Sequence, residues 1–192
     1  MSDGLPDDEQ TIAEMRRKAG HQEILGETLA KFEFFSNGWH PYTRFLDVDK
    51  IDLVLRRRRA TATEYREIQV KFGKLYALGT KWERELFSLT SWRFFSERDL
   101  VELEKQRGLY VCYVLAQDGG FRGDLFVFPV VEFAALVRGT RKSLQEKYRT
   151  LISCTRDNPP RWYIWSGHRV DSLRDDALVD VTRYYRNFAC LG

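Results

Sequence analysis

The sequence predicts a layered domain that combines helices and strands, of the α/β or α+β class. Three observations support this prediction: a helical stripe of apolar residues over 22–36, a strand pair over 51–72 that carries charged residues, and a nearly all-apolar strand over 109–116. Helical and extended segments therefore interleave along the chain. No internal repeat or low-complexity linker divides it, and 192 residues are enough for one domain with a substantial core.

Composition limits the class of protein and its partners. Hydrophobic residues make up 43% of the chain and charged residues 31%, which is typical of a globular protein. The net charge of +3 permits a nucleic-acid partner without requiring one, because clustering of charge matters more than its sum. The three cysteines are widely spaced, so neither a disulfide framework nor a zinc site is indicated. In the absence of a long apolar run, we expect a soluble, cytoplasmic protein with no membrane partner.

The first elements follow from periodicity and from the residues that interrupt it. A short helix is expected over 11–18, before Gly20. The clearer helix over 22–36 has one apolar stripe, which we expect to face the core: Ile24, Leu25, Thr28, Leu29, Phe32 and Phe35. The segment 39–45 is extended, and Pro41 favours an edge position or a strand start for it.

Later elements differ in how clearly the sequence defines them. Residues 73–96 are rich in aromatic side chains at mixed spacing and predict one or two strands. The remaining expected elements are a helix over 97–107, strands over 109–116 and 125–128, a helix over 129–138 and a strand over 162–165.

Charged side chains lie within the strand pair at 51–72. Asp52 interrupts a run of Ile, Leu and Val residues. In the second strand, alternation places Glu67, Gln69 and Lys71 on one face and apolar residues on the other. An unpaired charge on a buried strand face is costly, so Asp52 and Lys71 require partners, a metal ion or solvent in a cleft.

Four short motifs occur in a recognisable order: Gly26-Glu27 followed by Gly38-Trp39, Asp49-Lys50-Ile51-Asp52-Leu53-Val54, Ile68-Gln69-Val70-Lys71, and Phe126-Val127-Phe128-Pro129 with Glu132-Phe133. This order resembles the PD-(D/E)xK nuclease superfamily, and within it the small endonuclease-like and Holliday-junction-resolvase-like members. The resemblance implies an α/β fold with a central mixed β-sheet flanked by helices, of the restriction-endonuclease-like kind. It also implies a homodimeric endonuclease that hydrolyses DNA phosphodiester bonds with Mg²⁺, or with Mn²⁺ as a substitute.

The resemblance assigns roles to individual residues. Asp52 would be the central metal ligand, Gln69 would occupy the position of an acidic ligand, and Lys71 would orient water or stabilise the phosphate. Glu27 would complete the coordination shell. Gln69 is a departure, because a neutral amide binds magnesium more weakly than a carboxylate, although Glu67 on the same strand face could supply the missing charge. Without that charge, the chain would be a catalytically weak or inactive nuclease-fold protein that binds DNA.

Structural roles compete with these catalytic ones. Glu27 could pair with Lys31, which lies one helical turn away, and Lys71 could pair with Glu67 on a solvated sheet face. A third alternative is an enzyme whose small-molecule cleft is lined by Asp52, Glu67 and Lys71.

The densest basic cluster follows the first strand and consists of Arg56, Arg57, Arg58 and Arg59. As contacts to phosphate groups, these arginines and Lys74 would position DNA without reading its sequence. For two of the four arginines, a solvated hairpin end is an equally good explanation.

The motifs also suggest how the chain is organised. We expect an N-terminal extension over 1–20, a nuclease-like core over 21–138, and a C-terminal extension over 139–192 that packs on the core.

Overall fold

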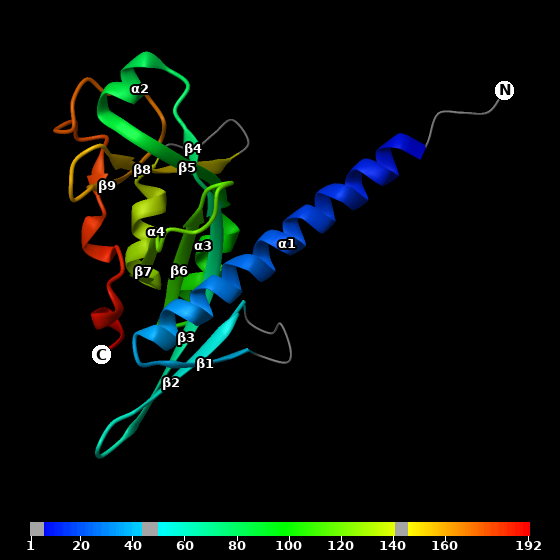
Figure 1. Ribbon diagram of the computed structural model, residues 1–192, viewed down its shortest axis with the longest axis vertical. Helices are drawn as coiled ribbons and strands as arrows, with labels where there is room; N and C mark the ends of the chain where they lie inside the picture. The colour runs from blue at the N-terminus through cyan, green and yellow to red at the C-terminus, as the bar shows by residue number, and fades with distance from the viewer. Residues whose placement is uncertain (1–5, 44–49, 141–145) are drawn as a thin grey trace.

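The computed structural model describes residues 6–43, 50–140 and 146–192, with side chains from residue 20 onward within these ranges. Its strands form two five-stranded sheets, against which the helices pack (Figure 1). The predicted α/β class, with a mixed sheet and flanking helices, is confirmed. Asp49 of the second motif lies outside the described residues.

The mixed sheet has the strand order β1-β2-β3-β6-β7. Its strands are β1 (His40–Thr43), β2 (Leu53–Arg58), β3 (Thr63–Lys74), β6 (Leu109–Ala116) and β7 (Leu125–Pro129). All neighbouring pairs are antiparallel except β3 and β6, which are parallel. The predicted apolar strand over 109–116 is confirmed as β6, which is buried because both faces of the sheet are covered.

The second sheet is antiparallel throughout and has the order β10-β9-β8-β5-β4. Its strands are β4 (Tyr76–Ala77), β5 (Phe87–Ser96), β8 (Lys147–Thr155), β9 (Trp162–Trp165) and β10 (Val179–Asp180). Residues 73–96 therefore contribute two strands, with the short helix α2 (Lys81–Leu86) between them. This sheet draws its strands both from the predicted core, 21–138, and from the predicted C-terminal extension.

The longest helix, α1 (Pro6–Ser36), is continuous over 31 residues, so the prediction of two helices separated near Gly20 is wrong. Its N-terminal half projects away from the sheets (Figure 1). The other helices are α3 (Glu97–Glu104) and α4 (Val130–Arg138), and two 3-10 turns follow at Thr182–Tyr184 and Phe188–Leu191. No helix in the described ranges combines the length and the apolar character needed to cross a membrane.

The prediction of which face of α1 is buried is also wrong. Three members of the predicted stripe are 65%, 66% and 64% exposed: Ile24, Phe32 and Phe35. The helix instead turns Gly26 and Ala30 towards the sheet, and Ala30 is fully buried. A Cβ atom at Gly26 would lie 2.9 Å from the Cβ atom of Phe72 in β3. Small residues therefore allow a close approach of α1 to the sheet, which larger apolar residues on the stripe would prevent.

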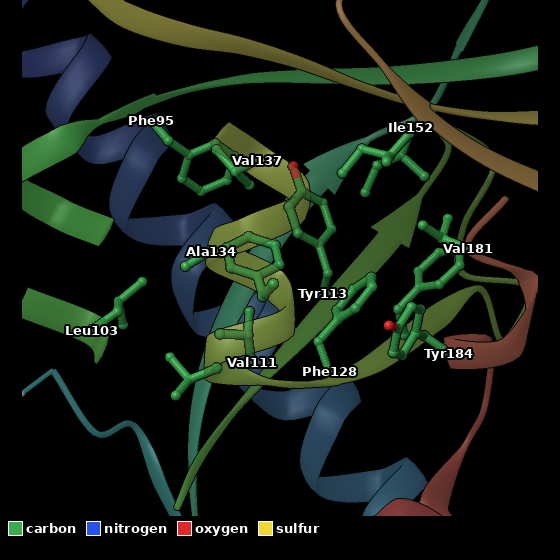
Figure 2. Close-up of a cluster of buried hydrophobic side chains, with 14 of the residues drawn as sticks. Phe95, Leu103, Val111, Tyr113, Phe128, Ala134, Val137, Ile152, Val181 and Tyr184 are labelled. Atoms are coloured by element: carbon green, nitrogen blue, oxygen red, sulfur yellow. The ribbon is translucent and has the colours of Figure 1, made fainter. Parts of the chain in front are cut away.

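Two apolar clusters cover the two faces of the mixed sheet. The cluster beneath α1 includes Ile68 and Val70 of β3. The cluster on the opposite face includes Val111 of β6 and joins β5, β6, β7, α3, α4 and β8 (Figure 2). Because Gln69 is the register partner of Val111, Gln69 and Lys71 face the second cluster. The predicted alternation along β3 is therefore confirmed.

The second sheet crosses close to the end of β3 that carries Lys71. At Gly73, an added Cβ atom would lie 2.5 Å from the Ser91 hydroxyl and 2.8 Å from the Tyr113 ring. Only glycine fits this crossing without displacing its neighbours. The crossing brings β5 and the helix that follows it next to Lys71.

Hydrogen bonds join the C-terminal segment, residues 186–192, to α1 and to the β2–β3 hairpin. Arg186 donates to the buried carboxylate of Glu33 at 2.8 Å. The backbone carbonyls of Leu191 and Gly192 accept from Arg66 at 2.7 Å and from Arg59 at 2.6 Å. The last residues therefore cover the side of the mixed sheet that α1 leaves open.

Candidate functional site

Asp52 lies immediately before β2, where the ladder between β2 and β3 ends. Leu53 is paired with Ile68, so continuation of this register places Asp52 beside Gln69. The Asp52 amide donates to the Ile68 carbonyl at 3.0 Å, and the Val70 amide donates to the Asp52 carboxylate at 2.6 Å. The carboxylate thus replaces a backbone carbonyl and extends the ladder by one hydrogen bond.

A pocket of about 150 Å³ lies where β3, β5 and α3 meet. Its lining residues are Lys50, Gln69, Lys71, Arg93, Phe94, Phe95, Asp99 and Leu103. A water molecule takes up about 30 Å³ in the liquid. The pocket therefore has room for a phosphate group or a hydrated ion.

Gln69 presents a buried oxygen at this pocket. The residue is only 4% exposed, and its Oε1 atom has no hydrogen-bond partner among the described residues. A buried acceptor without a partner destabilises the fold by about 1–3 kcal/mol. A rotation of the amide group would let this oxygen accept a donor or bind a cation in the pocket.

Lys71 lies next to Gln69 in the same pocket and is partly buried. Burial and, to a smaller extent, the positive charge of Arg93 lower the pKa of its ammonium group to about 8, against the opposing effect of the nearby Asp52 carboxylate. Lys71 therefore exchanges protons close to neutral pH, unlike an ordinary lysine.

The charges around the pocket do not cancel. The Asp99 carboxylate accepts from Ser96 at 2.6 Å and from Lys50 at 3.0 Å, and these hydrogen bonds hold the pKa of Asp99 below its usual value. Arg93 donates to the Phe72 carbonyl, a neutral group, at 3.0 Å. With Asp99 matched by Lys50, the wall formed by Lys71 and Arg93 is positive and favours an anion.

Asp52 and Gln69 fit a magnesium ion as a small set of oxygen ligands. Within residues 6–43, 50–140 and 146–192, no three His, Cys, Asp or Glu side chains are grouped closely enough to hold a metal. Magnesium, however, commonly binds through one or two protein carboxylates and retains several waters. Because Asp52 and Gln69 are adjacent in register, their oxygens are the two predicted ligands that would hold such an ion.

None of the three predicted acids, Asp52, Glu27 and Glu67, is among the residues that line the pocket. Glu27 is on α1, which covers the opposite face of β3, and it forms the ion pair with Lys31 that its spacing permits, at 3.7 Å. Glu67 is two residues before Gln69 and is paired with Val54 of β2. The structure thus brings Gln69 and Lys71 together in the pocket, with Asp52 beside Gln69 at the end of the ladder, and leaves Glu27 and Glu67 apart from them.

The predicted basic cluster occupies the opposite end of β2. At a rise of about 3.3 Å per residue, Arg58 is about 20 Å along the strand from Asp52. Arg57 and Arg59 both pair with Glu64, at 2.9 Å and 3.2 Å. These two arginines stabilise the hairpin end, and contact of the cluster with DNA stays a prediction.

Arg56 and Lys74 also have partners within the chain. Hydrogen bonds with Tyr65 and Tyr42 raise the pKa of Arg56. The Lys74 ammonium pairs with Asp118 at 2.5 Å. Both residues can still contact phosphate, but only in competition with these interactions.

Arg93 is the pocket residue that sequence reasoning missed. It lies in the aromatic-rich segment 73–96. Because its neighbours Trp92, Phe94 and Phe95 are all aromatic, the alternation of polar and apolar residues that marks a strand cannot be recognised there. The sequence does contain one signal, which is a positively charged residue within an aromatic strand. When such a residue is buried, it requires a hydrogen-bond or ion-pair partner, or a cleft open to solvent. Its proximity to Lys71 depends on the crossing of two sheets, which no local pattern reveals.

Comparison of the chain with protein-family models, curated proteins and solved structures found no match. Functional inference therefore depends on the geometry of the site.

Proposed function

We propose that the chain is a magnesium-dependent endonuclease that hydrolyses DNA phosphodiester bonds beside Asp52, Gln69 and Lys71. The observation that carries this proposal is the Gln69 side chain, which lines a pocket with a positive wall and has a buried oxygen without a partner among the described residues. A metal ion would satisfy that oxygen, and the cations would bind the phosphate group. The mixed sheet with flanking helices supports the finer proposal of a restriction-endonuclease-like fold.

The chemistry divides among a few side chains. Asp52 and Gln69 would hold magnesium, which when bound polarises a phosphoryl oxygen and lowers the pKa of a coordinated water. With a pKa of about 8, roughly a tenth of Lys71 is neutral at pH 7. The neutral amine accepts a proton from the attacking water, and the protonated form stabilises negative charge on phosphate. Arg93 binds a second phosphate oxygen.

Nicking of supercoiled plasmid DNA tests the proposal. Cleavage is expected in Mg²⁺ or Mn²⁺ and not in EDTA, and Asp52→Asn and Lys71→Met should each lower the rate by about 10²-fold or more. Asp52→Asn keeps an oxygen acceptor for the Val70 amide. Matched controls are Asp171→Asn and Lys105→Met, at side chains that are 90% and 64% exposed. Full activity of Asp52→Asn would contradict the metal-ligand role.

A second candidate function is DNA binding without efficient cleavage. The ion pair of Glu27 with Lys31, away from the pocket, supports this candidate because Glu27 then does not add a second predicted carboxylate ligand to Asp52. Salt-sensitive DNA binding without a cleavage product in either metal would favour it. No DNA binding at low salt would contradict both candidates and favour a small-molecule cleft.

We also propose that the protein is a homodimer, because one phosphodiester site per chain cuts one strand of a duplex. The exposed stripe on α1, which includes Ile24, Phe32 and Phe35, supports this proposal with an apolar surface for a second copy. Sedimentation velocity should show a dimer that Phe32→Glu dissociates and Gln22→Glu does not. A monomer at micromolar concentration would refute it.

A further inference from the structure

Two aromatic side chains of β5 lie on the outer face of the second sheet. Trp92 and Phe94 are 50% and 42% exposed, and their ring centroids are 5.7 Å apart in an edge-to-face arrangement. Trp92 is paired with Leu151, which packs with Phe87 and Trp165 in a third apolar cluster, on the outer face of this sheet. Arg93 and Phe95, the alternate residues, point inwards, and both line the pocket. The tryptophan is unusual, because Trp39, Trp162 and Trp165 are 0%, 2% and 1% exposed.

Two basic side chains accompany these aromatic residues on the neighbouring strand. Arg149 is the register partner of Phe94, and Lys147 is the register partner of Ser96. Residues paired directly across antiparallel strands have side chains on the same face. Both basic residues are exposed. Trp92, Phe94, Lys147 and Arg149 together form a surface that we call the aromatic–basic platform.

We infer that the aromatic–basic platform binds a single-stranded segment of nucleic acid, with bases on Trp92 and Phe94 and phosphates on Arg149 and Lys147. Aromatic rings beside basic side chains are the arrangement that binds single strands, because every base has a face for stacking and every linkage carries a charge. The positive side chains make nucleic acid a better occupant than an apolar protein surface.

The position of the platform also connects it with the pocket. Phe94 belongs to both, and Arg93 lies between Trp92 and Phe94 with its guanidinium group in the pocket. A strand that stacks on the platform can therefore continue around β5 and present a phosphate to Lys71 and Arg93. This inference deepens the proposed function and rests on it for the nature of the ligand. It assigns duplex DNA with an unpaired segment, rather than a continuous duplex, as the substrate class, because bases within a continuous duplex are already stacked on one another.

Fluorescence anisotropy in EDTA tests binding separately from cleavage. The probes are a labelled 15-nucleotide oligothymidylate and a blunt duplex of the same length. Trp92→Ala and Phe94→Ala should each weaken oligothymidylate binding by about 5- to 150-fold, with a smaller effect on the duplex. Trp92→Phe keeps an aromatic face and should restore most of the affinity. Arg149→Ala should lower the slope of log affinity against log salt by about 0.7.

Val131→Ala provides the control, since this valine is 58% exposed but lies on α4. It should leave oligothymidylate binding unchanged. Equal affinity of Trp92→Ala and the wild type for oligothymidylate would overturn the inference. So would a loss of self-association in Trp92→Ala without a loss of DNA binding, which would assign the platform to a second copy of the chain.

The results also separate this inference from the proposed function. Oligothymidylate binding that depends on Trp92, with no cleavage in Mg²⁺ or Mn²⁺, would support the platform and refute the nuclease proposal. Plasmid cleavage that depends on Asp52, with no effect of Trp92→Ala on binding, would support the nuclease and refute the platform.

Discussion

Replacement of Lys71 by methionine should stabilise the protein while it abolishes cleavage. The pKa of Lys71 is about 8 in the folded protein, against an ordinary value of 10.5. The unfolded chain therefore binds a proton more tightly than the folded one, and the protonated lysine opposes folding. At pH 7 the difference amounts to about 3 kcal/mol in the free energy of unfolding. Methionine has a similar length and carries no charge, so Lys71→Met should recover much of this energy.

The change with pH in the stability difference between Lys71→Met and the wild type is a sharper test than its value at pH 7 alone. Below pH 8 the lysine is charged in both states, and the destabilisation is complete. As the pH rises from 8 to 10.5, the folded form loses its proton first, so the wild type gains stability relative to Lys71→Met. The advantage of the variant should fall from about 3 kcal/mol at pH 7 to about 2 kcal/mol at pH 9, and to less than about 0.5 kcal/mol near pH 10.5.

Urea unfolding in EDTA at pH 7 and pH 9, followed by circular dichroism, measures these differences. Lys105→Met, at an exposed lysine on the surface next to α3, should change the free energy of unfolding by less than about 0.5 kcal/mol at either pH. A variant at Lys71 that is less stable than the wild type at pH 7, or whose advantage does not change with pH, would refute the assignment of a buried, destabilising lysine.

Three further predictions concern packing and the metal ligands. Arg186→Ala should lower the free energy of unfolding by about 2 kcal/mol, because it leaves the Glu33 carboxylate buried without its ion pair. Thermal unfolding measures this loss of stability. The double variant that also carries Glu33→Gln should regain part of it. Gly26→Ala should be about 1–3 kcal/mol less stable than Gly20→Ala in urea, because a Cβ atom meets β3 only at Gly26. Gln69→Glu should melt at a lower temperature than the wild type in EDTA, because the new carboxylate is buried without a counter-ion. Its melting temperature should rise again in Mg²⁺, which the carboxylate binds. A melting temperature insensitive to Mg²⁺ would contradict a metal site at Gln69.

The elements that local patterns define could be predicted from the sequence. β6 is apolar along its length, and β3 alternates strictly, so both were predicted with the correct faces. Asp52, Gln69 and Lys71 could be brought together because a short hairpin fixes their register. Local patterns of this kind do not depend on the remainder of the chain.

The buried face of α1 and the second sheet could not be predicted in this way. On α1, the exposed Phe32 and Phe35 are as hydrophobic as the buried Phe34, but the close approach to the sheet depends on the small size of Gly26 and Ala30. In β5, aromatic residues occur on both faces, so hydrophobicity does not show the alternation. The pairing of β5 with β8 joins residues more than fifty positions apart, and the position of Arg93 in the pocket depends on it.

The alternation along β5 also determines where the chain can tolerate insertions. One added residue between Ser91 and Phe95 would exchange the two faces of the strand, so that Arg93 would turn to solvent and an aromatic ring would enter the pocket. A loop such as the turn after Gln117 can absorb a residue without such an exchange. Insertion scanning of β5 would therefore disrupt the pocket and the outer surface together. Homologous chains of the same architecture should keep the length of this strand, while the lengths of their loops vary.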